Sequence, residues 1–203
     1  MARPRAFDEA AVLARARDLF WERGYAATSI GDLERGLGIS RSSLYATFGD
    51  KRALYDRTLA AYRDENLGRL RTLLTEATDL RATLERVFAD AAAAKADCRA
   101  GARGCYVVNA TTEMANACAD ALGFVSGNRE RFVALLREAL TRARDAGQLA
   151  READPQALAN YLFVCYNGLQ VVVQTDIPRT ELAAAVRLGV AALPWTEASA
   201  TAS

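Results

Sequence analysis

The chain has 203 residues, a formal net charge of +1 and 51% hydrophobic residues, which is enough to bury one large core or two small ones. It contains no histidine, which excludes a Ser-His-Asp triad, a histidine general base and histidine metal ligands. The cysteines Cys98, Cys105, Cys118 and Cys165 are too widely spaced for a CxxC motif. We therefore expect neither an enzyme nor a bound metal or cofactor.

The N-terminal sequence lacks the apolar run of a signal peptide, and no stretch of about 18 apolar residues could cross a bilayer. We therefore expect a cytoplasmic protein with reduced thiols and no membrane partner. The small net charge gives no global basic field, but a local basic patch suffices for binding DNA.

The first predicted helix runs from Asp8, a typical N-cap residue, to Gly24, which ends it. Its buried face repeats at helical spacing and consists of Val12, Ala16, Leu19 and Phe20. This helix is expected to support the segment that follows.

Residues 28–51 predict two short helices joined by a tight turn. Ser29 and Asp32 have the spacing of a capping box, and Gly38 can end the first helix in a left-handed conformation. Ser40 can cap the second helix, which starts at Arg41. This arrangement is typical of a helix-turn-helix, in which the second helix enters the DNA major groove.

The rest of the chain predicts further helices and no strand. They are expected at about 50–74, 81–96, from Cys105 onward, 123–146, 155–174 and 179–193, with a loop at 97–104. The predicted fold is all-α with about nine helices. We divide it into a helix-turn-helix domain (1–50), an effector-binding and dimerisation domain (51–195) and a disordered tail (196–203).

The sequence resembles the TetR family of bacterial transcriptional regulators. The matching residues are Thr28-Ser29, Gly38-Ile39-Ser40, Leu44-Tyr45, Phe48 and Lys51-Arg52-Ala53-Leu54, with Val12, Ala16, Leu19-Phe20 and Gly24-Tyr25 upstream. They cover about a quarter of the chain. The resemblance implies a homodimer that binds double-stranded operator DNA and responds to a small-molecule effector.

Residues that contact DNA are expected at the start of the second motif helix, where Arg41, Ser42 and Ser43 face the base edges. Arg41 is the main candidate, since only it can make a bidentate contact with guanine; the alternative is a solvated cation. The resemblance implies a phosphate contact for Tyr45. Further phosphate candidates are Thr28, Thr47 and Lys51.

The last two helices are the candidates for the dimer interface. One stripe consists of Leu158, Leu162, Cys165, Leu169 and Val172, and the final helix adds Val186 and Val190. An ordinary core would give the same pattern, but the resemblance favours a four-helix interface between two subunits.

The remaining helices are expected to enclose an effector cavity. Its candidate residues are Phe88, Tyr106, Asn109, Thr112, Glu113, Phe132, Tyr161, Tyr166 and Gln170. Glu113 lies in an apolar helix and needs a partner, either an internal arginine or a cationic ligand. The segment from Arg103 to Asn109 also resembles a family variant in which a cysteine senses electrophiles or oxidants, here Cys105; the alternative is a small buried hydrophobe.

The sequence therefore predicts a ligand-responsive homodimeric DNA-binding regulator, a repressor released from its operator by a small molecule. A thiol-based sensor that uses Cys105 is the alternative. A helical binding protein whose head no longer contacts DNA also remains open. Neither the effector nor the operator can be identified from the sequence.

Overall fold

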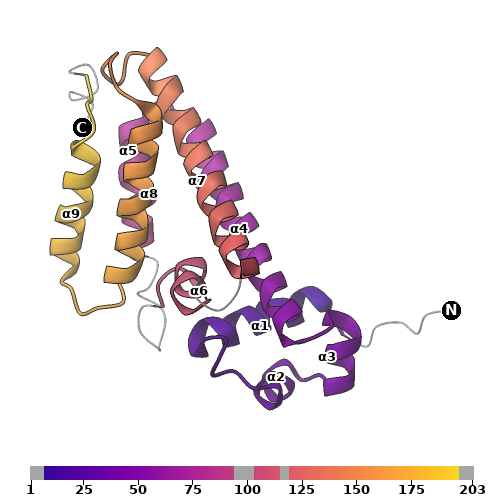
Figure 1. The fold of residues 1–203 in the computed structure, drawn as a ribbon. Coiled ribbons are helices and arrows are strands. Elements are labelled where there is room, and N and C mark those ends of the chain that lie inside the picture. The colour runs from indigo at the N-terminus through magenta and orange to yellow at the C-terminus, as the bar shows by residue number, and fades with distance from the viewer. Residues whose placement is uncertain (1–6, 94–102, 115–118, 197–203) are drawn as a thin grey trace.

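The computed structural model describes residues 7–93, 103–114 and 119–196. Over these residues the chain forms nine α-helices, and its only strand-like feature is an isolated bridge between Leu149 and Trp195 (Figure 1). The helices are α1 (Glu9–Arg23), α2 (Ile30–Leu37), α3 (Arg41–Phe48), α4 (Lys51–Thr75), α5 (Leu80–Ala93), α6 (Tyr106–Met114), α7 (Ala119–Asp145), α8 (Pro155–Val172) and α9 (Arg179–Ala191). The predicted all-α fold is confirmed.

The first four helices all begin at a side chain that caps their free amides. Asp8 accepts hydrogen bonds from two amides of α1, and Ser29 and Asp32 form the complete capping box of α2. Ser40 accepts from the first turn of α3, and Asp50 from that of α4. Each cap satisfies amides that have no partner within the helix. The helix starts predicted from these residues are confirmed.

Helices α1–α3 form a small head, from which the long α4 runs alongside α7 (Figure 1). The head core joins Phe20, Leu33 and Leu44 to the first turns of α4 and to Tyr106 of α6. A second core lies between α4, α5, α7, α8 and α9. Helix α4 thus contributes buried residues to both cores, whereas the buried residues of α6 belong to the head core.

The region after Cys105 differs from the prediction. Instead of one continuous buried helix, α6 ends at Met114, and α7 begins at Ala119 and runs to Asp145. Most of the predicted loop 97–104 and of the tail lies outside the described residues. Thr196, the last described residue, donates a hydrogen bond to the carbonyl of Gly147 at 2.7 Å.

Candidate DNA-binding surface and effector cavity

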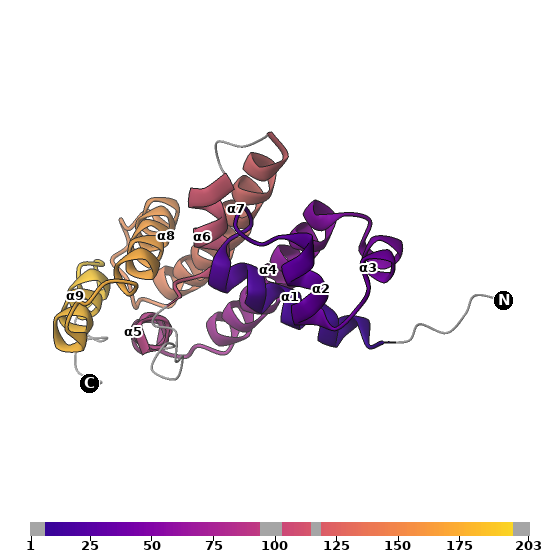
Figure 2. The same ribbon diagram turned by 90° about the horizontal axis from the view of Figure 1, so that it is seen from below.

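The exposed face of α3 lies at the outer edge of the head (Figure 2). Arg41 and Ser42 are exposed and Tyr45 is 41% exposed, whereas Leu44 and Phe48 are buried beneath them. The guanidinium of Arg41 lies 5.9 Å from the centre of the Tyr45 ring. The helix therefore presents a cation, a hydroxyl and a phenol to the solvent, side chains that can contact bases and phosphates.

The start of α3 is fixed by hydrogen bonds from both sides of the turn. The Ser40 hydroxyl accepts from the Ser43 amide at 3.2 Å and lies 2.9 Å from the hydroxyls of Ser42 and Ser43. The carboxylate of Glu34 on α2 accepts from the Arg41 amide at 2.6 Å. These bonds hold the two motif helices in one relative orientation, which a DNA contact requires.

The predicted phosphate contacts fall into two groups. Lys51, the first residue of α4, is half-buried, and its ammonium lies 4.3 Å from the centre of the Tyr25 ring. Thr47 is half-buried on α3. Thr28, in contrast, is fully buried, and its hydroxyl donates to the Gly24 carbonyl at 2.7 Å. The Thr28 side chain therefore stabilises the turn before α2 and is not presented to a phosphate, which corrects the prediction.

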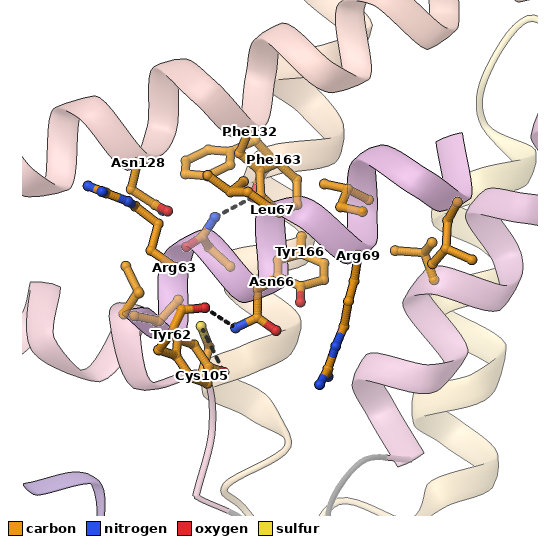
Figure 3. Close-up of a pocket in the computed structure, with 16 residues that line it drawn as sticks. Tyr62, Arg63, Asn66, Leu67, Arg69, Cys105, Asn128, Phe132, Phe163 and Tyr166 are labelled. Atoms are coloured by element: carbon orange, nitrogen blue, oxygen red, sulfur yellow. Dashed lines mark hydrogen bonds between the residues drawn. The ribbon is translucent and has the colours of Figure 1, made fainter. Parts of the chain in front are cut away.

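A cavity of about 140 Å³ lies between α4, α6, α7 and α8 (Figure 3). We call it the inner lobe. Its wall contains aromatic rings, amides and a thiol: Tyr62, Phe132, Phe163, Tyr166, Asn66, Asn128, Asn167 and Cys105. A second space of about 400 Å³, the outer lobe, shares Tyr62, Asn66 and Tyr166 with it and adds polar residues, among them Asp90 and Gln170. A pocket of this composition between bundle helices is a typical ligand site.

Only part of the predicted effector set lies in this cavity. Phe132, Tyr166 and Cys105 line the inner lobe, and Gln170 lines the outer one. Phe88 is buried and packs edge-on against Tyr166, with ring centres 5.8 Å apart, so it supports the wall without lining it.

Tyr161 does not belong to the cavity. It is 40% exposed, and its hydroxyl donates to the Gly189 carbonyl of α9 at 3.3 Å. It lies on the opposite face of α8 from the cavity wall, which corrects its assignment as an effector residue.

Tyr106, Asn109 and Glu113 lie on α6 where it meets the head. The Glu113 carboxylate accepts from the amides of Tyr25 at 3.0 Å and Ala26 at 2.8 Å, in the turn between α1 and α2. Its partner is therefore the backbone of the head, and not the arginine or cationic ligand that was predicted. The Tyr106 hydroxyl lies 2.8 Å from the Thr58 hydroxyl in the head core.

A second contact joins α6 to α1. The Arg103 carbonyl, just before α6, accepts from the Trp21 indole at 3.1 Å and from the Asn109 amide at 2.6 Å. Gly104 allows this close packing, because its φ is +67° and a Cβ there would lie 2.3 Å from the Gln174 amide nitrogen. The head is thus hydrogen-bonded to the helix whose other residues line the cavity.

The tyrosines around the cavity are neutral. Burial is the largest cause that raises the pKa of Tyr62 and Tyr166 above the ordinary value. They act as hydroxyl donors and acceptors and not as anions.

The predicted dimer stripe faces the interior of its own subunit. Leu162, Leu169, Val186 and Val190 are at most 9% exposed in the bundle core, and Leu158 and Cys165 pack against it half-buried. Of this stripe only Val172, 38% exposed, faces the solvent. The residues predicted for the dimer interface lie on the inner faces of α8 and α9. The sequence does not separate inner from outer faces here, because both faces of these helices are apolar.

The outer faces of α8 and α9 are apolar as well. Val164 is 68% exposed, Leu188 is 72% exposed, and Val171 and Tyr161 extend the same surface. Figure 1 shows α8 and α9 side by side at the end of the bundle away from the head. An exposed apolar surface of this kind is typical of a protein interface. We call these four residues with Val172 the outer α8–α9 face.

Comparison with known proteins decides the family. Residues 12–58 match the family described as bacterial regulatory proteins, tetR family, and residues 80–188 match the tetracyclin repressor-like C-terminal domain. The chain belongs to the TetR family. It is a helix-turn-helix transcriptional regulator, as the resemblance predicted.

Relatives of this TetR-family protein are similar to it in sequence over most of its length. It is 31% identical to the HTH-type transcriptional regulator YezE of Bacillus subtilis, over 80% of this chain and 84% of YezE. It is 28% identical to the HTH-type transcriptional repressor ComR of Escherichia coli, over 83% and 80% of the two chains. A cysteine mutant of the TetR-family regulator CifR, solved with 26-bp operator DNA, superposes with a TM-score of 0.82 at 31% identity, covering 95% of this chain and all of the other.

Among the described residues of this TetR-family chain, no helix has the length and apolar character needed to span a membrane. Over the same residues, no group of three or more acidic or cysteine side chains could hold a metal ion.

Sequence reasoning missed several site residues. Tyr62, Asn66 and Asn167 line the cavity, and Trp21 and Gln174 lie at the junction between head and bundle. No motif marks them, because they come from different helices and meet only in the folded chain.

Proposed function

We propose that this regulator is a homodimeric repressor that binds operator DNA through α3 and leaves it when a small molecule occupies the inner lobe. One observation carries the proposal: a cavity with a mixed aromatic and amide wall is joined by α6 to a head whose α3 exposes Arg41 and Tyr45. The printed names of ComR, a repressor, and CifR, solved with operator DNA, support it. Because it acts on DNA, the protein is cytoplasmic in this proposal.

Within the proposed complex, Arg41 is the main base-contacting residue. Its guanidinium is exposed at the first turn of α3, from which the major groove is contacted, and it can donate two bonds to one guanine. Tyr45 and Lys51 contact phosphates and set the register of the head on the duplex.

Operator binding by Arg41→Ala tests this assignment. The operator is first selected from random duplexes with the full-length protein. We expect Arg41→Ala to weaken binding by about 1–3 kcal/mol and to relax the preference at one base pair. Arg137→Ala, an exposed arginine on α7 far from the head, is the matched control. If the two variants bind the operator with equal affinity, Arg41 is not part of the DNA interface. If no duplex can be selected, the proposed DNA-binding function is wrong.

The second subunit is proposed to pack on the outer α8–α9 face, which gives a four-helix interface. Two heads can then occupy successive major grooves, about 34–36 Å apart. Release requires that the effector binds better to a conformation with a different head separation, since equal affinity for both conformations changes nothing. The hydrogen bonds of Glu113 and of the Arg103 carbonyl couple the cavity wall to the head.

Thiol sensing by Cys105 is the second candidate. Cys105 is half-buried in the cavity wall directly before α6, and the Tyr62 hydroxyl donates to its Sγ at 3.8 Å. Modification there would change the position of α6. If operator release by an oxidant is lost in Cys105→Ser but kept in Cys165→Ser, the thiol is the sensor. Release unchanged in Cys105→Ser contradicts this candidate.

A further inference from the structure

The inner lobe has the size of one aromatic ring. Its volume of about 140 Å³ is close to the ~150 Å³ of an apolar cavity that admits benzene in another protein. The centre of the Phe132 ring lies 5.5 Å from that of Phe163 and 5.0 Å from that of Tyr166, so the wall offers edges and faces to a flat ligand (Figure 3).

The charged side chains that border the inner lobe form ion pairs. Two arginines border it, and each is paired with a carboxylate of α4. The Arg63 guanidinium lies 3.0 Å from the Asp64 carboxylate and packs over the Phe124 ring, with 4.7 Å between the guanidinium carbon and the ring centre. Arg69 is 70% exposed and forms an ion pair with Glu65. A charged ligand would lose its hydration and would have to compete with these ion pairs for a counter-charge, which costs several kcal/mol.

Two side-chain oxygens of the wall are open to a hydrogen-bond donor of a ligand. The side-chain amide of Asn66 donates to the Tyr62 carbonyl at 3.0 Å, and that of Asn167 donates to the Phe163 carbonyl at 2.7 Å. Within the described part of the chain, the Oδ1 atom of neither asparagine accepts a hydrogen bond. The Tyr62 hydroxyl is already directed at Cys105.

We propose that the effector is a neutral molecule with a single aromatic ring and an O–H or N–H donor, such as a phenol or a ring N–H heterocycle. The ring fills the inner lobe, and its donor bonds to Oδ1 of Asn66 or Asn167. Asn66 also borders the outer lobe, so a substituent on the ring extends into that larger polar space. This inference rests on the proposed role of the cavity as the effector site.

Four probes of similar size separate the parts of the proposal: phenol, toluene, benzoate and cyclohexanol. Their dissociation constants for the full-length protein are measured by calorimetry, supported by thermal shift. We expect phenol to bind about tenfold or more tightly than each of the others, because toluene lacks the hydrogen-bond donor, benzoate carries a charge and cyclohexanol lacks the aromatic ring. If toluene binds as tightly as phenol, the ligand does not need a hydrogen-bond donor. If benzoate binds as tightly as phenol, the ligand need not be neutral. If cyclohexanol binds as tightly as phenol, the ligand does not need an aromatic ring.

Two variants locate the binding site. In Asn66→Leu or in Asn167→Leu the preference for phenol over toluene should fall about tenfold while toluene binding persists, a ratio that a general loss of stability does not change. Gln156→Leu, the same type of change at an exposed position in the first turn of α8, should keep the preference. An unchanged ratio in both Asn66→Leu and Asn167→Leu would overturn the assigned anchors.

Operator binding is measured in the same samples, so that the two proposals fail separately. Phenol that binds and releases the selected operator supports both. If the protein binds operator but none of the four probes, the ligand class is wrong and the regulatory function stands. If phenol binds with the expected ratios but no duplex is bound, the function is wrong and the site stands.

Discussion

The head core is more closely packed than the bundle core. In the head, Phe20, Leu33 and Leu44 are at most 1% exposed, and all three head helices begin at a capping side chain. The bundle core surrounds a cavity, and its outer helices leave Val164 and Leu188 mostly exposed. The part that contacts DNA is therefore complete within one chain, whereas the bundle leaves space for a ligand and a surface for a second subunit.

This difference explains how one fold can be both stable and responsive. A close-packed core resists deformation, because every contact has a partner. A core with a cavity has fewer contacts to lose when helices shift, and a ligand that fills the cavity can select one arrangement. Helix α4 contributes buried residues to both cores, and α6, whose buried residues belong to the head core, also lines the cavity.

The largest expected effect comes from charging the outer α8–α9 face. Val164→Asp combined with Leu188→Asp should convert the dimer to a monomer, because a buried unpaired carboxylate is strongly unfavourable. Operator binding should lose about half of its free energy, on the order of 5 kcal/mol, since each head then binds alone. Ala89→Asp, on the exposed side of α5, is the control. Sedimentation that still shows a dimer would contradict the assigned interface.

A pair of matched truncations measures the difference in packing directly. Phe20→Ala should lower the free energy of unfolding by about 3–5 kcal/mol, as is typical of a fully packed phenylalanine. Phe132→Ala should cost only about 1–2 kcal/mol, because one side of its ring already borders empty space. Urea unfolding at equal protein concentration gives both values. Equal losses would show that the two cores are packed alike.

A smaller effect is expected at the junction between the two cores. Glu113→Gln keeps the shape of the side chain but replaces the carboxylate that accepts from the amides of Tyr25 and Ala26. We expect a loss of about 1–2 kcal/mol and faster hydrogen exchange at these two amides. Glu138→Gln on the exposed side of α7 should change neither. Unchanged exchange at Tyr25 and Ala26 would exclude the contact.

The smallest effect concerns acid stability of the head. The hydroxyl and amide of Ser29 lower the pKa of Asp32 to about 2. A lowered pKa means that the contribution to stability is present above the ordinary value near 4 and is lost as the pH falls towards 2. The melting temperature of Asp32→Asn should therefore lie below that of the native protein at pH 6, and the gap should close below pH 4.

Much of the head could be predicted because its signals are local. A cap, a left-handed glycine and the apolar repeat act within a few residues, so Ser29, Gly38 and Ser40 defined α2 and α3 before any tertiary contact was known. The exposed position of Arg41 followed from the same helix geometry. Thr28 was the exception, since only the folded turn shows that its hydroxyl bonds to Gly24.

The inner and outer faces of the bundle helices cannot be told apart from the sequence, because these helices are apolar on more than one face. In α8, Leu162 and Val164 are equally apolar, yet one is 1% and the other 68% exposed. Periodicity cannot decide which face turns inward when both are candidates. The same limit applied to Tyr161 and Tyr166, two tyrosines of one helix that lie on opposite sides of it.

The sequence by itself determined the all-α class, the helix-turn-helix and the family, because caps, turns and apolar repeats are properties of short segments. Only the tertiary structure decided which side chains enclose the cavity, which face of α8 and α9 is free, and what binds Glu113. Those outcomes depend on how helices far apart in the chain pack together, and the carboxylate of Glu113 finds its partners 87 and 88 residues away.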